Sequence, residues 1–167
     1  NGVSWCVANR CNVVGNAPLE RIRIITDRYR AEWAAAGHAA NTLPLMGTTR
    51  HMVIAPTDAE AQDLAREAYA RWHRSFMYLW DLHGTTPGAY FPATWDELAA
   101  AWRALAGTPQ TVREQMLHQI EVSGINFVLT RFAFGDISFV HSQRSVSLFA
   151  SDVMPWILER TSALQAA

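Results

Sequence analysis

Short apolar runs that alternate with amphipathic helices restrict this chain to an α/β architecture. The runs cover residues 3–8, 50–55 and 126–132, and each is rich in β-branched or aromatic side chains. A run that is apolar on both faces is typical of a strand in a parallel sheet that helices cover on both sides. The order of the elements therefore predicts consecutive β-α units.

Capping and turn residues set the expected ends of the helices. N-caps are expected at Asn16, at Thr57 or Asp58, at Thr94 in a capping box with Glu97, and at Thr108. Gly37 is the expected stop of the first helix, and Pro155 marks the end of the last helix or a kink in it. The expected helices span residues 17–36, 58–80, 95–105, 109–123 and 139–153.

Three β-α units form neither a closed barrel nor a complete open sheet. A (β/α)8 TIM barrel takes about 250 residues, whereas this chain has 167. The chain also opens on Asn1 without an initiator Met, directly before the first expected strand. We therefore predict a single partial domain over residues 1–167, the C-terminal part of a TIM barrel with about three β-α units, strands 6–8. We expect this part alone to be inactive, because its sheet edges would be open.

Composition excludes several classes of function. Half of the residues are hydrophobic, which is typical of a folded domain, and 14 basic against 15 acidic side chains give a net charge of −1. That balance argues against binding of nucleic acid, and no apolar run is long enough to span a membrane. All the basic residues are Arg, so lysine chemistry is absent. Cys6 and Cys11 are expected to be reduced thiols in a cytosolic (cytoplasmic) protein, and the spacing of the six histidines predicts no metal site.

Several segments in a fixed order resemble the C-terminal signature of the bacterial luciferase-like monooxygenases. Four of them follow one another in the second half of the chain, and two lie upstream. They are Gly107–Val112, Ser123–Asn126, Phe132–Asp136 and Ser147–Pro155, preceded by Thr57–Ala61 and Arg71–Phe76. The opening Asn1-Gly2-Val3 is similar to the end of the helix before strand six of that family.

This resemblance implies a TIM barrel that binds reduced FMN supplied by a flavin reductase. The family uses O2 to oxygenate a small organic substrate, commonly as a homo- or heterodimer. Its catalytic residues and principal flavin-phosphate contacts come from the first five β-α units, which would lie upstream of Asn1. Two alternatives stay open: a non-catalytic partner subunit of the same family, and an oxidoreductase that uses the deazaflavin F420. Residues 81–106 resemble the family's inter-strand insertion, whose loop at 82–94 is a candidate lid.

The ends of the expected strands provide the candidate cofactor-binding residues, because TIM-barrel sites lie at the carboxyl ends of the strands. Asn9 and Arg10 follow the first run, and Arg131 and Phe132 close the third. The arginine donor fork suits a flavin phosphate, a reduced-flavin anion or a substrate anion, although an ion pair with a carboxylate is an alternative. The rings of Trp5, Phe132 and Phe134 are expected either to line the flavin or to pack in the core.

Overall fold

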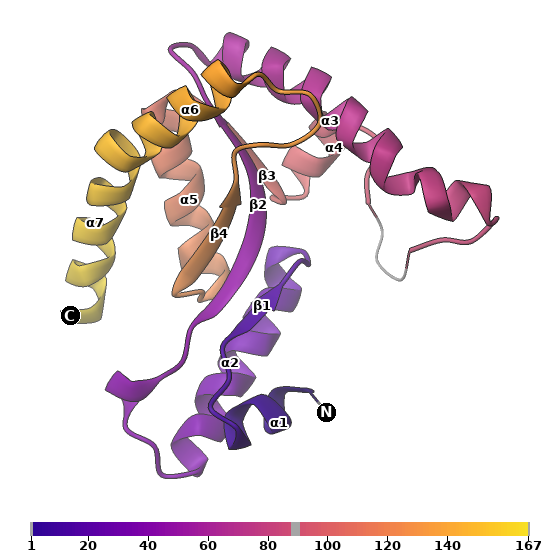
Figure 1. The fold of residues 1–167 in the computed structure, drawn as a ribbon. Helices are drawn as coiled ribbons and strands as arrows, with labels where there is room; N and C mark the ends of the chain where they lie inside the picture. The colour runs from indigo at the N-terminus through magenta and orange to yellow at the C-terminus, as the bar shows by residue number, and fades with distance from the viewer. Residues whose placement is uncertain (1, 88–90, 167) are drawn as a thin grey trace. The chain divides into compact units, whose positions relative to one another are not determined.

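The structure, a computed structural model, describes residues 2–87 and 91–166 and divides into two compact units. The first unit combines residues 1–50 with 117–130, and the second combines residues 51–116 with 131–167. The strands are β1 (Val13–Gly15), β2 (Met46–Ile54), β3 (Ala104–Gly107) and β4 (Phe127–Arg131) (Figure 1). The α-helices are α1 (Gly2–Ala8), α2 (Leu19–Ala35), α3 (Asp58–Leu82), α4 (Trp95–Ala100), α5 (Pro109–Ser123), α6 (Phe139–Leu148) and α7 (Met154–Ala166).

The first predicted strand is wrong, because residues 3–8 form the helix α1. Val3 and Val7 lie four residues apart, so a helix places both side chains on one face. That face packs against Tyr29 and Trp33 of α2. The hydroxyl of Tyr29 donates to the carbonyl of Cys11 at 2.9 Å, which fixes the turn after α1. A six-residue apolar run is ambiguous between strand and helix, and here packing against α2 selects the helix.

The strand that replaces it, β1, is short and pairs in parallel with the start of β2. Strand β4 also pairs with β2. The helix between β1 and β2 begins at Leu19, and Pro18 occupies the N-cap position without a side-chain cap, so the predicted cap at Asn16 is wrong. Pro18 is extended, with ψ of 153°, which leaves the residues before it outside the helix. Gly37, with φ of +76°, follows the helix end as predicted.

Polar residues in the first half of β2 are hydrogen-bonded inside the first unit. The Thr48 hydroxyl donates to the carbonyl of Gly15 at 2.8 Å, and Nε of the buried Arg50 donates to Gln119 Oε1 at 2.8 Å. These partners explain why β2 begins at Met46, four residues before the predicted start. The hydrophobic periodicity of the sequence does not reveal this part of β2, because its polar side chains form hydrogen bonds with residues of other elements.

The second unit contains a strand that sequence analysis missed. β3 pairs in parallel with β2, with Ala104 opposite His51 and Gly107 opposite Ile54. Ala104 and Leu105 were predicted to end the helix capped by Thr94, but α4 ends at Ala100 and Trp102 takes a positive φ of 56° that turns the chain. The small side chains of Ala104 and Ala106 pack against the alanines of α3, so close packing overrides the helix propensity of alanine.

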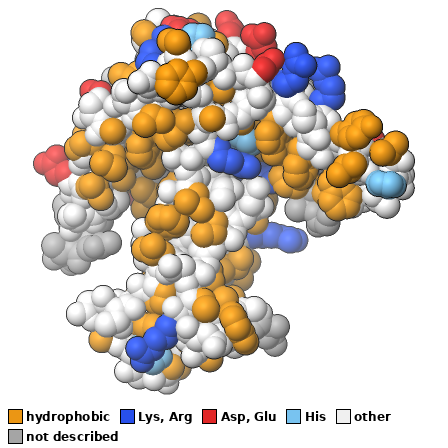
Figure 2. Space-filling model, in the orientation of Figure 1, with side chains coloured by type: hydrophobic (Ala, Val, Ile, Leu, Met, Phe, Trp, Pro, Cys, Tyr) orange, Lys and Arg blue, Asp and Glu red, His pale blue; other side chains and the backbone are white. Residues whose placement is uncertain are grey.

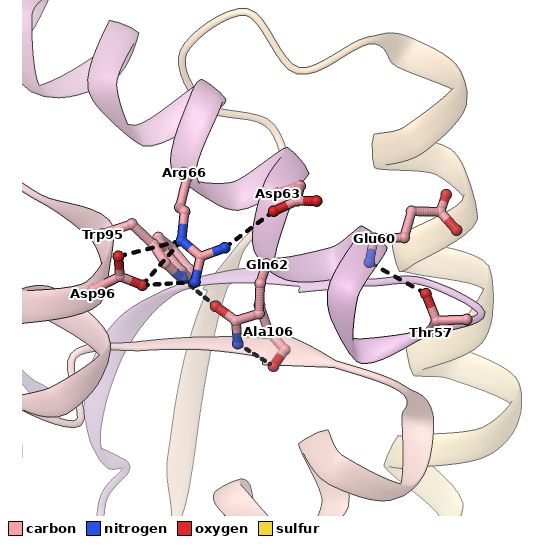
Figure 3. A network of polar contacts seen from close by, with 8 residues as sticks. All are labelled: Thr57, Glu60, Gln62, Asp63, Arg66, Trp95, Asp96 and Ala106. Carbon is pink, nitrogen blue, oxygen red and sulfur yellow. Dashed lines mark hydrogen bonds and ion pairs between the residues drawn. The ribbon is translucent and has the colours of Figure 1, made fainter.

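Polar contacts connect α3 to α4 and β3 in the second unit (Figure 3). Thr57 caps α3 as predicted, accepting from the backbone N–H of Glu60, and Thr94 caps α4 in the same way. The indole N–H of Trp95 donates to Gln62 Oε1 at 2.7 Å, and Nε2 of Gln62 donates to the carbonyl of Ala106 at 3.0 Å. Gln62 therefore joins all three elements from the inside. On the outside, Arg66 makes ion pairs with Asp63 and Asp96.

The predicted last helix is interrupted by a π-helical turn at Phe149–Val153, which separates α6 from α7. Pro155 lies in the first turn of α7, where its missing N–H costs little, and the helical run continues past it to Ala166 instead of ending near Val153 as predicted. Figure 1 shows the helical run bending between α6 and α7. Figure 2 shows hydrophobic side chains gathered over these helices, and the exposed ones include Phe139, Val140, Val146, Met154 and Leu158.

The hydroxyl of Ser145 is the buried polar link between α6 and the end of β2. It accepts from the backbone N–H of Ile54 at 3.0 Å and lies 3.1 Å from the carbonyl oxygen of the same residue, to which it donates. We expect Ser145→Ala to lower the free energy of unfolding by about 1–3 kcal/mol, because it leaves both buried backbone groups without this partner. Urea denaturation measures the loss. Ser147→Ala, at an exposed position of the same helix, is the matched control and should change stability by less than about 0.5 kcal/mol.

Candidate functional site

The predicted site residues Asn9 and Arg10 follow a helix rather than a strand. The side-chain amide of Asn9 donates to the carbonyl of Trp5 at 2.9 Å, and Arg10 adopts a positive φ of 54°. Both residues therefore form the turn that ends α1. They do not lie at the end of a strand, and their role in cofactor binding stays a prediction. Trp5, which was expected to line a flavin or pack in the core, is 63% exposed.

Arg131 closes a strand, as predicted, and Phe132 follows it directly. Arg131 is the last residue of β4, and its guanidinium lies 5.7 Å from the centre of the Trp72 ring on α3. The carbonyl of Phe132 accepts from the hydroxyl of Ser142 at 2.9 Å, and its ring contacts that of Phe149, with centroids 5.5 Å apart. These contacts fix the backbone at the point where the chain leaves β4.

A fully buried histidine lies in the second unit, which also contains Arg131. His51 of β2 is 1% exposed, and aromatic rings surround its imidazole. The ring centroids of Trp72 and Phe134 lie at 4.6 and 4.4 Å, and that of Tyr69 lies at 5.7 Å. Neither imidazole nitrogen has a hydrogen-bond partner within the described part of the chain. Burial of an imidazole among aromatic rings costs free energy when its nitrogens have no hydrogen-bond partner. His51 is therefore a candidate functional residue.

A second guanidinium adjoins this shell. Arg103, which is 6% exposed, lies 5.0 Å from the centre of the Phe91 ring, and the Phe91 and Trp72 rings are 6.1 Å apart. The guanidinium groups of Arg131 and Arg103 thus lie over two neighbouring aromatic rings, those of Trp72 and Phe91. We call His51, Trp72, Phe91, Arg103, Arg131 and Phe134 the arginine–aromatic cluster.

Burial and like charge keep the histidine of this cluster neutral. Desolvation, followed by the positive charges of Arg131 and Arg103, lowers the pKa of His51 to about 3. Desolvation also lowers the pKa of Arg131, and repulsion from Arg103 adds to this. At neutral pH the cluster therefore presents guanidinium cations beside an uncharged imidazole, an arrangement suited to binding a negative charge.

The other residues that the sequence analysis considered either pack in the core or lie outside the arginine–aromatic cluster. Phe134 is buried in the core, and its ring contacts the imidazole of His51. Cys6 and Cys11 are free thiols. Among residues 2–87 and 91–166, no group of three potential ligands could hold a metal ion, and no helix is both long and apolar enough to cross a membrane.

The predicted insertion at 81–106 is only partly a loop. Its first residues complete α3, and it then contains α4 and most of β3, whose residues Ala104, Leu105 and Ala106 are buried. This end of the insertion is core structure. For the loop at 82–94, of which residues 88–90 lie outside the described part, the role of a lid stays a prediction.

Sequence reasoning did not single out His51, Trp72 or Arg103 as site residues. One signal was present, because His51 and Arg50 interrupt a strand that is otherwise apolar over Met52, Val53 and Ile54. Arg103 was placed in a helix that does not extend that far. The cluster depends on contacts between residues far apart in the sequence, which periodicity does not reveal.

Comparison with known proteins identifies the family. The family model described as luciferase-like monooxygenase matches residues 11–126, more than half of the chain. The chain belongs to the luciferase-like monooxygenase family. The resemblance of its motifs to this family is thereby confirmed. A curated relative, the uncharacterized protein y4wF of Sinorhizobium fredii, is 31% identical over 150 residues, which cover 90% of this chain and 44% of the relative.

Solved structures of the family share the fold. Monooxygenase RslO1 from Streptomyces bottropensis matches with a TM-score of 0.74 and 21% identity, over 92% of this chain and 44% of its own. The oxygenating constituent of 3,6-diketocamphane monooxygenase from Pseudomonas putida, solved in complex with FMN, matches with a TM-score of 0.67 and 18% identity over the same shares. The chain therefore has the α/β fold of these luciferase-like proteins and spans less than half of their length.

Proposed function

We propose that the full-length protein is a flavin-dependent monooxygenase that uses reduced FMN and O2 to oxygenate a small organic substrate. Membership of the luciferase-like monooxygenase family supports this, as do relatives that are monooxygenases, one of them in complex with FMN. We further propose that this chain is the carboxyl-terminal part of a (β/α)8 barrel. The described residues contain four strands, each followed by a helix, which supports four β-α units rather than the three predicted.

The residues of the arginine–aromatic cluster fit a bound flavin. Arg131 has no hydrogen bond or ion pair within the described residues, and its Nε–H is buried, so it has donors available for a ring carbonyl or an anion. Phe132 follows it and supplies an apolar ring. Reduced FMN, when bound, supplies the electrons that activate O2. The chain's own residues would hold the ring, exclude water through their aromatic side chains, and keep His51 neutral.

The observation that carries the proposal is a half-buried arginine without a polar partner, at the end of a strand, in a chain of this family. A flavin reductase as the source of reduced FMN, a homo- or heterodimeric assembly and a cytoplasmic location belong to the same proposal. The catalytic residues are proposed to precede Asn1. Asn9 and Arg10 stay candidate cofactor contacts, although they follow a helix rather than a strand.

The test is to compare the full-length protein with residues 1–167 alone. We expect the full-length protein to bind reduced FMN and to consume O2 with an added flavin reductase, and the shorter chain to show no oxygenase turnover. Turnover with reduced F420 instead of FMN would assign the protein to the F420 branch. A full-length protein that binds neither cofactor would favour a non-catalytic subunit and contradict the proposal.

A further inference from the structure

Cys6 and Cys11, the two cysteines of the chain, lie on either side of the turn that ends α1. The backbone N–H of Cys11 donates to the carbonyl of Cys6 at 2.9 Å, and the N–H of Arg10 donates to that of Val7 at 3.1 Å. With Arg10 at φ of 54°, these two bonds form a Schellman motif, in which the side chains of the two outer residues commonly contact each other. The end of the helix therefore brings together two cysteines that are five positions apart in the sequence.

The buried side chain of Tyr29, on α2, holds the same two residues. Its hydroxyl donates to the carbonyl of Cys11 at 2.9 Å and lies 3.3 Å from the carbonyl oxygen of Cys6. Burial raises the pKa of Tyr29, and the electrostatic effects of Cys6 and of Cys11 add to this. The two thiols thus lie near one hydroxyl, and the backbone that carries them is fixed from the neighbouring helix.

The separation of the two cysteines suits a disulfide. Because a hydrogen bond of 2.9 Å joins the carbonyl of one to the N–H of the other, standard backbone dimensions keep their Cα atoms within about 6.8 Å of each other. Disulfides usually join Cα atoms that are about 4.4–6.8 Å apart. The Cys11 thiol now lies 3.7 Å from the carbonyl oxygen of Asn9, a weak hydrogen bond that a disulfide would replace. Both cysteines are partly exposed, so a small oxidant reaches them.

We propose that Cys6 and Cys11 are a redox-active thiol pair that hydrogen peroxide oxidises to an intramolecular disulfide. The thiolate of one cysteine attacks peroxide and keeps one oxygen as a sulfenic acid, while the other oxygen leaves as hydroxide and takes up the thiol proton to become water. The second thiol then attacks the sulfenic sulfur, so that the S–S bond forms and a second water leaves. Peroxide is reduced and the two thiols are oxidised. In a reducing compartment a disulfide of this kind is transient and senses the redox state.

Trypsin provides a direct readout, because Arg10 lies between the two cysteines. Cleavage after Arg10 and Arg21 places Cys6 on the peptide that ends at Arg10, and Cys11 on the peptide Cys11–Arg21. The full-length protein is treated with peroxide, its free thiols are blocked with iodoacetamide, and the digest is analysed by mass spectrometry without reductant. We expect the fraction of joined peptides to rise at least about fivefold over untreated protein, and dithiothreitol to separate them. A non-reducing gel verifies that the link lies within one chain.

Ala8→Cys combined with Cys11→Ser is the matched control. It keeps two thiols in the same segment, since Ala8 is an exposed residue of α1, but residues two apart on a helix do not face each other. Peroxide should give at least about tenfold less disulfide in this variant, read as the loss of two hydrogens from the peptide that ends at Arg10. Cys11→Ser alone should stop at the sulfenic acid of Cys6, which dimedone labels. Circular dichroism of each variant verifies that it is folded.

The proposal is overturned if the two peptides stay separate after peroxide treatment of the folded protein. It is also overturned if the folded control variant forms as much disulfide as the parent, because the turn would then not determine the reaction. The inference goes beyond the monooxygenase proposal and does not depend on it, since the readout is a bond between two peptides. Joined peptides in a full-length protein without flavin-dependent turnover would contradict the monooxygenase alone, and turnover with separate peptides would contradict the thiol pair alone.

Discussion

Gly135→Ala is expected to lower the free energy of unfolding by about 4 kcal/mol or to prevent folding of the second unit. Gly135 follows β4 with φ of +61°, and a Cβ at this position would lie 1.9 Å from the carbonyl oxygen of Ala68 on α3. Both groups are backbone or attached directly to it, so no side-chain rotation relieves the overlap. The loop after β4 would have to move away from α3. Urea denaturation followed by circular dichroism measures the loss.

Gly84→Ala is the matched control for this substitution. Gly84 has nearly the same backbone conformation, with φ of +60°, but no atom lies within 4 Å of the position of a new Cβ. It should therefore cost only the conformational penalty of a left-handed alanine, about 1 kcal/mol. Equal losses at the two positions would show that conformation rather than contact with Ala68 determines the effect, contrary to the expected difference.

His51 makes the protein sensitive to acid in a defined range of pH. Burial beside Arg131 and Arg103 lowers its pKa to about 3 in the folded state, whereas an unfolded histidine has a pKa of about 6.5. Between these two values the unfolded chain binds a proton that the folded chain does not. Stability therefore falls as pH falls through 6.5, and the loss continues until about pH 3. Between pH 7 and 4.5 this histidine alone is expected to cost about 2–3 kcal/mol.

The His51→Leu variant isolates this contribution. Urea denaturation at pH 7 and at pH 4.5 should show a loss in the variant that is smaller by about 2–3 kcal/mol than in the parent chain. His83→Gln, at an exposed position beyond α3, should retain the full loss of the parent. A parent chain and a His51→Leu variant with the same pH dependence would mean that His51 is accessible to water and titrates normally.

Elements with their own start and stop signals were predictable from the sequence. α3 and α5 begin at the predicted caps Thr57 and Thr108, and β4 lies within the predicted strand. These signals act between residues close in the sequence. α1 and β3 were not predictable, because a short apolar run and a run of small residues take the form that their neighbours impose. Packing against Tyr29 decides the first, and packing against Ala65 decides the second.

The candidate site was predictable only in part, and for the same reason. Arg131 and Phe132 were predicted as site residues from their place at the end of a strand, and that strand is β4. Asn9 and Arg10 came from the same rule applied to a helix. His51 and Arg103 lie 52 positions apart in the sequence, and the pairing of β2 with β3 brings them together. The importance of His51 follows from imidazole nitrogens that have no hydrogen-bond partner among the described residues, a property that a sequence does not display.

The π-helical turn at Phe149–Val153 has a consequence for how this end of the chain tolerates change in length. A π turn accommodates one residue more than an α turn, and each residue of an α-helix advances the direction of its side chains by about 100°. Deletion of a single residue within the π turn would remove this extra residue, restore an uninterrupted helix and leave α7 facing nearly as it does now. The side of α7 that carries Ile157 into the interior would keep its place. Deletion of a residue within α7 itself would instead turn the rest of that helix by about 100°. The π turn is thus the part of this helical run where the loss of one residue should be accepted most readily.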